Sequence, residues 1–222
     1  MNAHFRAPQL QSLFAQGKLQ EYARGESIGS THEKDLILLV VRGYIKRYMI
    51  RNDGSLGVQI IYGPQDLFSL TRIYNLLLGQ SLYKGPETYY YSAICDSAVL
   101  SLAPSVLQHG VEENPLLYKE LFSEAGQHLK TCVHAIENSS LNNIGVRVAH
   151  QLVFLFNEFG EPTPDGARLC LTLTHQDVAD MLGVTRAGVT LAIGQLRQKG
   201  LLLSDRTFVT PDLESLKKEA YS

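Results

Sequence analysis

The spacing of hydrophobic positions changes along the chain and first predicts a strand-rich region. In the first third, short segments rich in Val, Ile, Leu and Tyr are separated by turn residues such as Asn52-Asp53-Gly54. Short strands joined by tight turns are typical of a barrel or a sandwich. The predicted strands are 36–41, 44–50, 58–62, 88–95 and 98–102.

From Pro104 onward the spacing becomes helical. A short helix is predicted at 105–110, and Asn114-Pro115 opens a long helix, because proline is well accommodated near a helix start. Within this helix a heptad seam repeats at alternating spacings of four and three: Tyr118, Phe122, Ala125, Leu129, Cys132, Ile136 and Ser139. Such a seam favours packing against its own copy in a second chain. Burial against the strand-rich region of the same chain is the alternative.

Residues 138–143, with the sequence NSSLNN, are rich in capping and turn formers and predict a helix break that acts as a hinge. A helix follows at 144–159, and the Gly- and Pro-rich residues 160–166 predict a loop. Residues 168–173 alternate like a strand. After residue 200, segments 201–203 and 207–209 predict a β hairpin, and 213–220 predicts a short helix.

Residues 172–200 read as two helices joined at Gly183. Thr174 and Asp177 have the spacing of a capping box at the first helix, and Thr185 is placed to cap the second. A small residue where the helices approach and a glycine at the turn suit a steep crossing. The side chains expected to face inward are Val178, Ala179, Leu182, Val189, Leu191, Ile193 and Leu196.

The second of these helices carries no acidic residue between Thr185 and Gly200. A carboxylate on a helix lying against DNA would face phosphates, so this composition favours a DNA-binding helix over an ordinary helical hairpin in a core. Its exposed positions are expected to be Thr185, Arg186, Gly188, Thr190, Gln195, Arg197 and Lys199.

Composition narrows the picture further. The chain has 222 residues, enough for two small domains, and a formal net charge of −2, so any positive DNA-binding surface must be local and dimerisation must enlarge it. Three well-separated cysteines, Cys95, Cys132 and Cys170, form no C-x-x-C pair, and buried thiols are expected. No apolar run is long enough to span a membrane and no signal peptide is evident, which predicts a cytoplasmic protein.

The order of these elements resembles the catabolite-activator and fumarate-nitrate-reductase regulator (CRP/FNR) family of bacterial transcription factors. Asn114-Pro115, Arg147-Val148-Ala149, Thr174 to Val178, Leu182-Gly183 and Thr185-Arg186 follow the family's order and spacing. The resemblance implies an α+β fold with an amino-terminal cyclic-nucleotide-binding-like β roll (a jelly roll), a long dimerisation helix and a carboxyl-terminal winged helix-turn-helix. The corresponding domains are 1–110, 111–139 and 140–222.

The resemblance also implies partners. They are double-stranded DNA with a near-palindromic operator, a second copy of the chain, and RNA polymerase through residues 160–166 if the protein is an activator. The family's base readers are often an arginine, a glutamate and a second arginine. Arg186 matches the first, whereas Ala187 and Leu191 hold the other positions, so a different half-site is expected. The full predicted DNA-binding set is Thr174, His175, Gln176, Thr185, Arg186, Ala187, Gly188, Thr190, Leu191, Gln195 and Arg206.

In family members that bind cyclic nucleotides, a Gly-Glu pair holds the ribose and an Arg-Ser pair holds the phosphate. The matching positions here are Ser69-Leu70 and Glu87-Thr88, and a carboxylate would repel the phosphate, which argues against cyclic AMP. The remaining possibilities are that the protein binds an unknown small-molecule effector or that it has no effector. A pocket for an apolar or aromatic ligand would be lined by Leu70, Glu87, Thr88, Tyr89, Tyr91, Cys132 and Val133. Ordinary strand packing is the alternative for these tyrosines.

No cysteine cluster precedes Cys95, which argues against the family's iron–sulfur members, and no metal site is predicted. Haem binding is still an alternative, with His4, His32, His109, His128 or His134 as the residue that would bind the iron. A regulator that depends on cyclic nucleotide or haem, a dimeric signalling adaptor that does not bind DNA, and a cupin-like metalloenzyme are the alternatives. The enzyme is disfavoured because the predicted strands lack histidine, so no catalytic residue is assigned.

Overall fold

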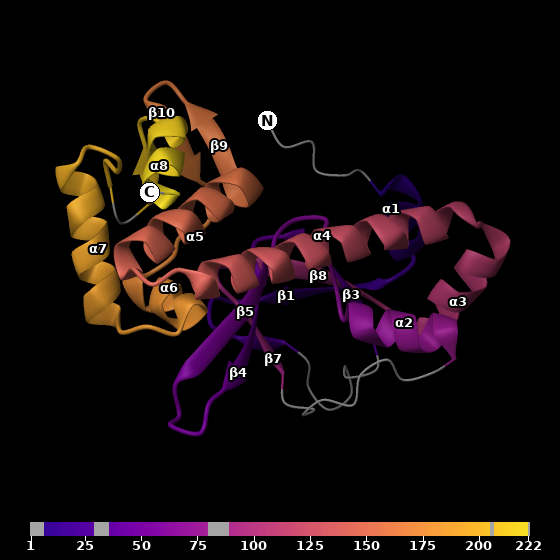
Figure 1. Cartoon of the computed structure of the whole chain (residues 1–222). Coiled ribbons are helices and arrows are strands. Elements are labelled where there is room, and N and C mark those ends of the chain that lie inside the picture. Colours follow the sequence, from indigo (N-terminus) through magenta and orange to yellow (C-terminus); the bar gives the residue numbers. More distant parts are fainter. Residues whose placement is uncertain (1–6, 29–35, 80–88, 205–206, 222) are drawn as a thin grey trace. The chain divides into compact units, whose positions relative to one another are not determined.

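The computed structural model describes residues 7–28, 36–79, 89–204 and 207–221. The chain forms two compact units (Figure 1). One consists mainly of residues 3–49 and 59–130, and the other contains 50–58 and 131–222. No helix among the described residues combines the length and apolar character that crossing a bilayer requires.

The amino-terminal region is a roll of two antiparallel sheets, each of four strands, with the strand orders β1-β8-β3-β6 and β2-β7-β4-β5. The predicted strands lie within two residues of β3, β4, β5, β7 and β8, whereas β1, β2 and β6 were not predicted. The strands are β1 Lys18–Tyr22, β2 Ser27–Ile28, β3 Ile37–Arg42, β4 Ile45–Ile50, β5 Leu56–Tyr62, β6 Leu67–Phe68, β7 Tyr90–Ala93 and β8 Ser97–Leu102.

Strand β3 supplies two separate hydrophobic cores. Ile37 and Leu39 pack in a core with residues of the surrounding helices, whereas Leu38 and Val40 pack in a second core that includes Tyr62. Successive side chains of a strand point to opposite faces, so a continuous apolar strand is expected to be buried on both. The surrounding helices are α1 Pro8–Phe14, α2 Leu70–Leu78, α3 Pro104–Glu113 and the first half of α4 Leu116–Ser140.

The buried side of α4 is tied to α1 by a carboxylate. Glu120 accepts hydrogen bonds from the backbone N–H groups of Gln9 (3.1 Å) and Leu10 (2.8 Å). These N–H groups belong to the first turn of α1, which has no side-chain cap of its own. The opposite side of α4 is exposed, and it carries the heptad seam, with Phe122 80% and Ile136 68% exposed.

In the carboxyl-terminal region, α5 contacts the helices α6, α7 and α8 and a three-stranded sheet of order β11-β10-β9 (Figure 1). The predicted helices at 144–159 and 213–220 are confirmed. The elements are α5 Ile144–Phe159, β9 Gly160–Thr163, β10 Gly166–Leu169, α6 His175–Leu182, α7 Arg186–Gln198, β11 Val209–Thr210 and α8 Leu213–Ala220.

Three predicted segments in this region were wrong. The predicted strand 168–173 is shorter, because β10 spans Gly166–Leu169 and residues 170–173 form no strand. Residues 160–166 form strand β9, a tight turn and the start of β10 rather than a loop, because β10 supplies backbone pairing that Gly and Pro composition does not reveal. In the β hairpin predicted from segments 201–203 and 207–209, residues 201–203 form no strand. Ser204 makes a single bridge with Val209, and β11 pairs with β10 instead.

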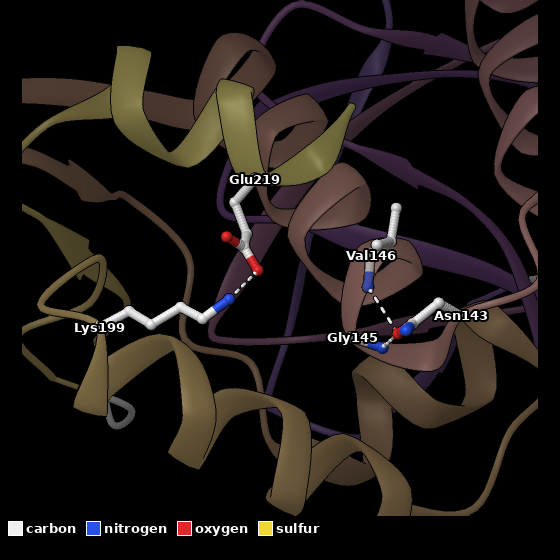
Figure 2. A network of polar contacts seen from close by, with 5 residues as sticks. All are labelled: Asn143, Gly145, Val146, Lys199 and Glu219. Atoms are coloured by element: carbon white, nitrogen blue, oxygen red, sulfur yellow. Dashed lines mark hydrogen bonds and ion pairs between the residues drawn. The ribbon is translucent and has the colours of Figure 1, made fainter. Parts of the chain in front are cut away.

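The predicted helix break is shorter than the segment 138–143. Helix α4 continues through Ser140, and the hydroxyls of Ser139 and Ser140 donate to the carbonyls of Ile136 and Glu137 within the helix. Only residues 141–143 separate α4 from α5. Asn143 then caps α5 by accepting from the N–H groups of Gly145 (2.7 Å) and Val146 (3.3 Å) (Figure 2).

The domain limits at residues 110 and 139 stay a prediction, since α4 runs on from one compact unit into the other. The expectation of buried thiols was wrong. Cys132 and Cys170 are exposed and Cys95 is half-buried. Cys132 belongs to the predicted heptad seam of α4.

Candidate DNA-binding site

The start and end of α6 are fixed by local hydrogen bonds. The Thr174 hydroxyl accepts from the N–H of Asp177 (3.1 Å), and the Asp177 carboxylate accepts from the N–H of Thr174 (2.9 Å), forming the predicted capping box. Gly183 ends the helix in the left-handed conformation at φ +63°, which glycine adopts without strain. The local sequence therefore specifies both the start and the end of α6.

Helix α7 begins at a second cap and divides into two faces. The Thr185 hydroxyl accepts from the N–H of Gly188 (3.2 Å). The buried face consists of Val189, Ala192, Ile193 and Leu196. Leu191 was expected to face inward, but it is 66% exposed, because it lies on the side of the helix opposite to these buried positions. The helical period, followed residue by residue from Val189, places Leu191 on the outer face.

The exposed face of α7 brings most of the predicted DNA-binding residues together. Thr185, Arg186, Ala187, Thr190, Leu191 and Gln195 are exposed, and Gly188 is half-buried. On α6 and its cap, Thr174 and Gln176 are exposed and His175 is half-buried. Arg206 lies outside the described residues. Within the described chain, the Arg186 guanidinium has no acidic partner, which leaves it available to a ligand.

Two side chains, those of His175 and Thr190, connect the two helices at this face. His175 Nδ1 lies 2.9 Å from the hydroxyl of Thr190, and that hydroxyl donates to the carbonyl of Arg186 (2.9 Å). Because the hydroxyl proton is used in this way, His175 is the donor to Thr190. The Gln176 amide donates to buried Asp180 (2.7 Å). The Asp180 carboxylate is thus already hydrogen-bonded within α6.

The cation at the end of α7 is directed away from this face. Lys199 forms an ion pair with Glu219 of α8 (Figure 2). The other two cations of α7, Arg186 at its start and Arg197 in its last turn, are exposed. The surface is therefore locally basic, although the whole chain is slightly acidic.

Removing the capping box provides a stability test of this site. We expect Thr174→Ala to lower the free energy of unfolding by about 1 kcal/mol, because α6 loses a hydroxyl acceptor for one of its unpaired N–H groups. Urea unfolding followed by circular dichroism measures the change. Thr172→Ala, at an exposed residue before the cap, is the control. Equal losses in both variants would contradict a capping role.

Two of the predicted effector residues, Leu70 and Tyr91, lie in different hydrophobic cores. Leu70 packs in the core that contains Ile37 and Leu39, whereas Tyr91 packs in the other core, on the opposite face of β3. Glu87 and Thr88 lie outside the described residues. The Tyr89 ring lies 4.7 Å from the Arg47 guanidinium, and Cys132 and Val133 are both exposed.

The second core contains an aromatic cluster beside two unusual ionisable groups of α4. The Tyr62 ring lies 5.4 Å from that of His128 and 5.3 Å from that of Phe68. Burial, with the nearby Arg47 charge, lowers the pKa of His128 to about 4. Burial, followed by the charges of Asp66 and Glu120, raises the pKa of Glu124 to about 7. His128 is thus neutral at pH 7.

Of the other histidines considered for haem, His4 and His32 lie outside the described residues. His109 is exposed and lies 3.2 Å from the carboxylate of Glu113. His134 is buried and stacks at 4.5 Å on His150, a residue that sequence reasoning missed. Burial lowers the pKa of His134 to about 4 and also lowers that of His150.

A polar network that sequence reasoning missed joins the end of α4 to α5 and α6. Buried Asn138 donates to the carbonyl of Arg147 (2.8 Å) and accepts from Arg147 Nε (3.2 Å). Arg147 also donates to the carbonyl of Leu182 at the end of α6 (2.7 Å). The sequence placed Arg147 and Leu182 in motifs that match the family and Asn138 in the predicted helix break, but it indicated no contact between them.

Comparisons with known proteins agree with this geometry. Residues 146–219 match the family model of the Crp-like helix-turn-helix domain. The chain is 25% identical over 196 residues to the global nitrogen regulator of Synechococcus elongatus, covering 87% of this chain and 85% of the relative. It is 22% identical over 202 residues to a CRP-like cAMP-activated global transcriptional regulator of Mycobacterium tuberculosis, and the match covers 90% of this chain and 87% of the relative.

The fold is also shared with a solved structure. A mutant of CooA from Carboxydothermus hydrogenoformans superposes with a TM-score of 0.73 at 22% identity, covering 94% of this chain and 90% of that one. This likeness extends through the β roll, the long helix and the helix-turn-helix. The chain is therefore a transcriptional regulator of the CRP/FNR family with a helix-turn-helix DNA-binding domain.

Proposed function

We propose that the protein is a homodimer that binds a near-palindromic DNA site, with α7 of each protomer in the major groove. The observation that carries this proposal is the exposed face of α7, which contains no acid and begins with Arg186, a residue that has no acidic partner among the residues that the structure describes. The caps of α6 and α7 fix this face before DNA arrives, which lowers the cost of ordering on binding. Arg186 is proposed to read a guanine through a bidentate contact.

The second copy of the chain is proposed to pack on the heptad seam of α4. Large apolar side chains are rare on a free surface when they form a continuous stripe, and such stripes mark interfaces. The same seam on both chains makes a self-complementary interface with twofold symmetry, as a palindromic site requires. The large exposed members are Tyr118, Phe122, Leu129 and Ile136, at 53%, 80%, 65% and 68%.

The β roll is proposed to respond to a signal other than a cyclic nucleotide, or to act without an effector. The Mycobacterium tuberculosis relative is named as cAMP-activated. In this chain, Glu87 replaces the phosphate-binding arginine of the family pattern, and apolar Val133 lies on the long helix. Aromatic rings of Tyr62, Phe68 and Tyr91 pack together inside the roll. Catalysis is not part of the proposed role.

If the protein activates transcription, the β9–β10 hairpin is the proposed contact with RNA polymerase. Its turn, Pro164-Asp165, is exposed. The two strands are held by the backbone ladder and by an ion pair between Arg168 and Glu161. A hairpin presents a better-ordered surface to a partner than a loop does.

The test of DNA recognition is selection of bound sequences from a random pool. We expect wild-type protein to enrich a near-palindromic site, and Arg186→Ala to lose about 1–3 kcal/mol of discrimination at one base pair of each half-site. Anisotropy titrations with each single-base variant of the selected site measure this loss.

The control is Arg197→Ala, at the other end of α7. It should weaken all sites to a similar extent, as loss of a phosphate contact does. Wild-type discrimination in Arg186→Ala would contradict its assignment as a base reader. Failure of wild-type protein to enrich any DNA would favour a dimeric adaptor.

A further inference from the structure

Three potential metal ligands come together where α4 meets α5. His134 and Glu137 are one turn apart on α4, and His150 lies on α5. One ligand atom from each side chain lies within 4.8 Å of the other two. Both histidines are buried, whereas Glu137 is exposed. The break at residues 141–143 folds the helices together, so sequence spacing alone did not indicate the cluster.

A cavity adjoins this cluster. It has a volume of about 330 Å³ and is lined by Glu137, Ser140, Leu141, His150, Ala220 and Tyr221. The imidazoles of His134 and His150 stack with an angle of 9° between their planes. A metal ion binds in the plane of an imidazole, so one ring must turn for both to reach the same ion. The cavity beside His150 provides room for that turn and for a water ligand.

The surroundings of His134 leave it a free lone pair. His134 Nε2 lies 3.1 Å from Oε1 of Gln151, and the Gln151 amide nitrogen is directed toward Met181 Sδ at 3.9 Å. The amide oxygen therefore accepts the Nε2 proton, and Nδ1 carries the lone pair. A histidine that donates one N–H to an oxygen while its other nitrogen stays open is the usual arrangement of a metal-binding histidine.

The surroundings of His150 connect the cluster to the polar network. Asn138 Oδ1 accepts from Arg147, so its amide nitrogen is the donor to His150 Nδ1 at 3.2 Å. An ion on His150 either replaces that donor at Nδ1 or takes Nε2 and moves the ring proton to Nδ1. Both changes break the Asn138–His150 hydrogen bond. Occupancy of the site would thus alter the contacts that tie α4 to α5.

We propose that His134, Glu137 and His150 bind one divalent first-row transition-metal ion per chain. Two imidazoles and one carboxylate, with water as the fourth ligand, match the coordination that Zn²⁺ adopts in proteins. The ion would bridge α4 and α5 beside the helix break. This proposal does not depend on DNA binding.

The experiment uses the full chain, first treated with a chelator and then dialysed. Zn²⁺ is titrated in competition with a chromophoric chelator, and Co²⁺ is added to a second sample as a spectroscopic probe. We expect one Zn²⁺ per chain with micromolar or tighter affinity, and the intense visible absorption of four-coordinate Co²⁺. Absence of Zn²⁺ binding would overturn the proposal.

Three variants locate the site. His150→Gln and Glu137→Gln should each weaken Zn²⁺ binding by at least about tenfold. Because Glu137 is exposed, its variant remains informative if the His150 variant fails to fold, which circular dichroism reports. His109→Gln removes a surface histidine that lies beside Glu113 and should bind Zn²⁺ as wild type does. Wild-type affinity in Glu137→Gln, or loss of binding in His109→Gln, would overturn the assignment.

Discussion

Phe122→Glu should convert the protein to a monomer and weaken its binding to a palindromic operator by at least about a hundredfold. Phe122 is the most exposed large apolar side chain of the seam, at 80%. In a twofold interface, a carboxylate at this position would be desolvated in both chains at once, close to its own copy. Each monomer would then have to bind its half of the operator independently, so the gain in affinity from two linked DNA-binding domains would be lost.

Sedimentation velocity measures the oligomeric state, and anisotropy titration against the selected operator measures the affinity. The matched control is Lys119→Glu, which places the same side chain at an exposed position of α4 outside the seam. It should stay dimeric. A Phe122→Glu protein that sediments as wild type does would show that this seam is not the dimer contact.

Glu124→Gln should stabilise the protein by up to about 3 kcal/mol at pH 8 and leave its stability nearly unchanged at pH 4.5. Glu124 is buried, and its pKa rises from the ordinary 4.5 to about 7 in the folded protein. The folded state therefore holds this proton more tightly than the unfolded chain does. As pH rises from about 4.5 to about 7, the carboxyl group reduces stability, and the reduction is complete above that range.

Glutamine has no proton to lose, and its amide oxygen can still accept from the N–H of Leu67, as Glu124 does. Urea unfolding of both proteins across this pH range gives the difference in free energy. His128, with its pKa lowered to about 4, removes stability as pH falls below about 6.5, but it does so in both proteins and cancels. Glu112→Gln, at an exposed residue, is the control. A difference that does not vary with pH would contradict the shifted pKa.

The sequence was sufficient where a structural feature depends on residues close together in the chain. The Thr174 and Asp177 capping box, the Gly183 turn and the Thr185 cap each involve residues no more than three positions apart. Their chemistry specifies the conformation without help from the rest of the fold. The limits of α5 and α8 were also predictable from local sequence, because the helical spacing of apolar residues continues through each helix.

The predictions from sequence were wrong where the structure depends on contacts between residues that are far apart in the chain. Residues 160–163 became a strand only because β10 pairs with them, and Leu70 and Tyr91 were separated by the two faces of β3. The meeting of His134 with His150 depends on how α4 and α5 pack. These are tertiary contacts, which periodicity and turn chemistry within a single segment do not encode.

The position of β3 in two cores has a consequence for cooperativity. Opening either core would expose one face of the same strand, so neither should melt while the other stays closed. A molecule that binds on one side of the roll would then raise the melting temperature of the whole roll. Thermal-shift screening can thus detect a ligand of this region whichever face of the strand it occupies.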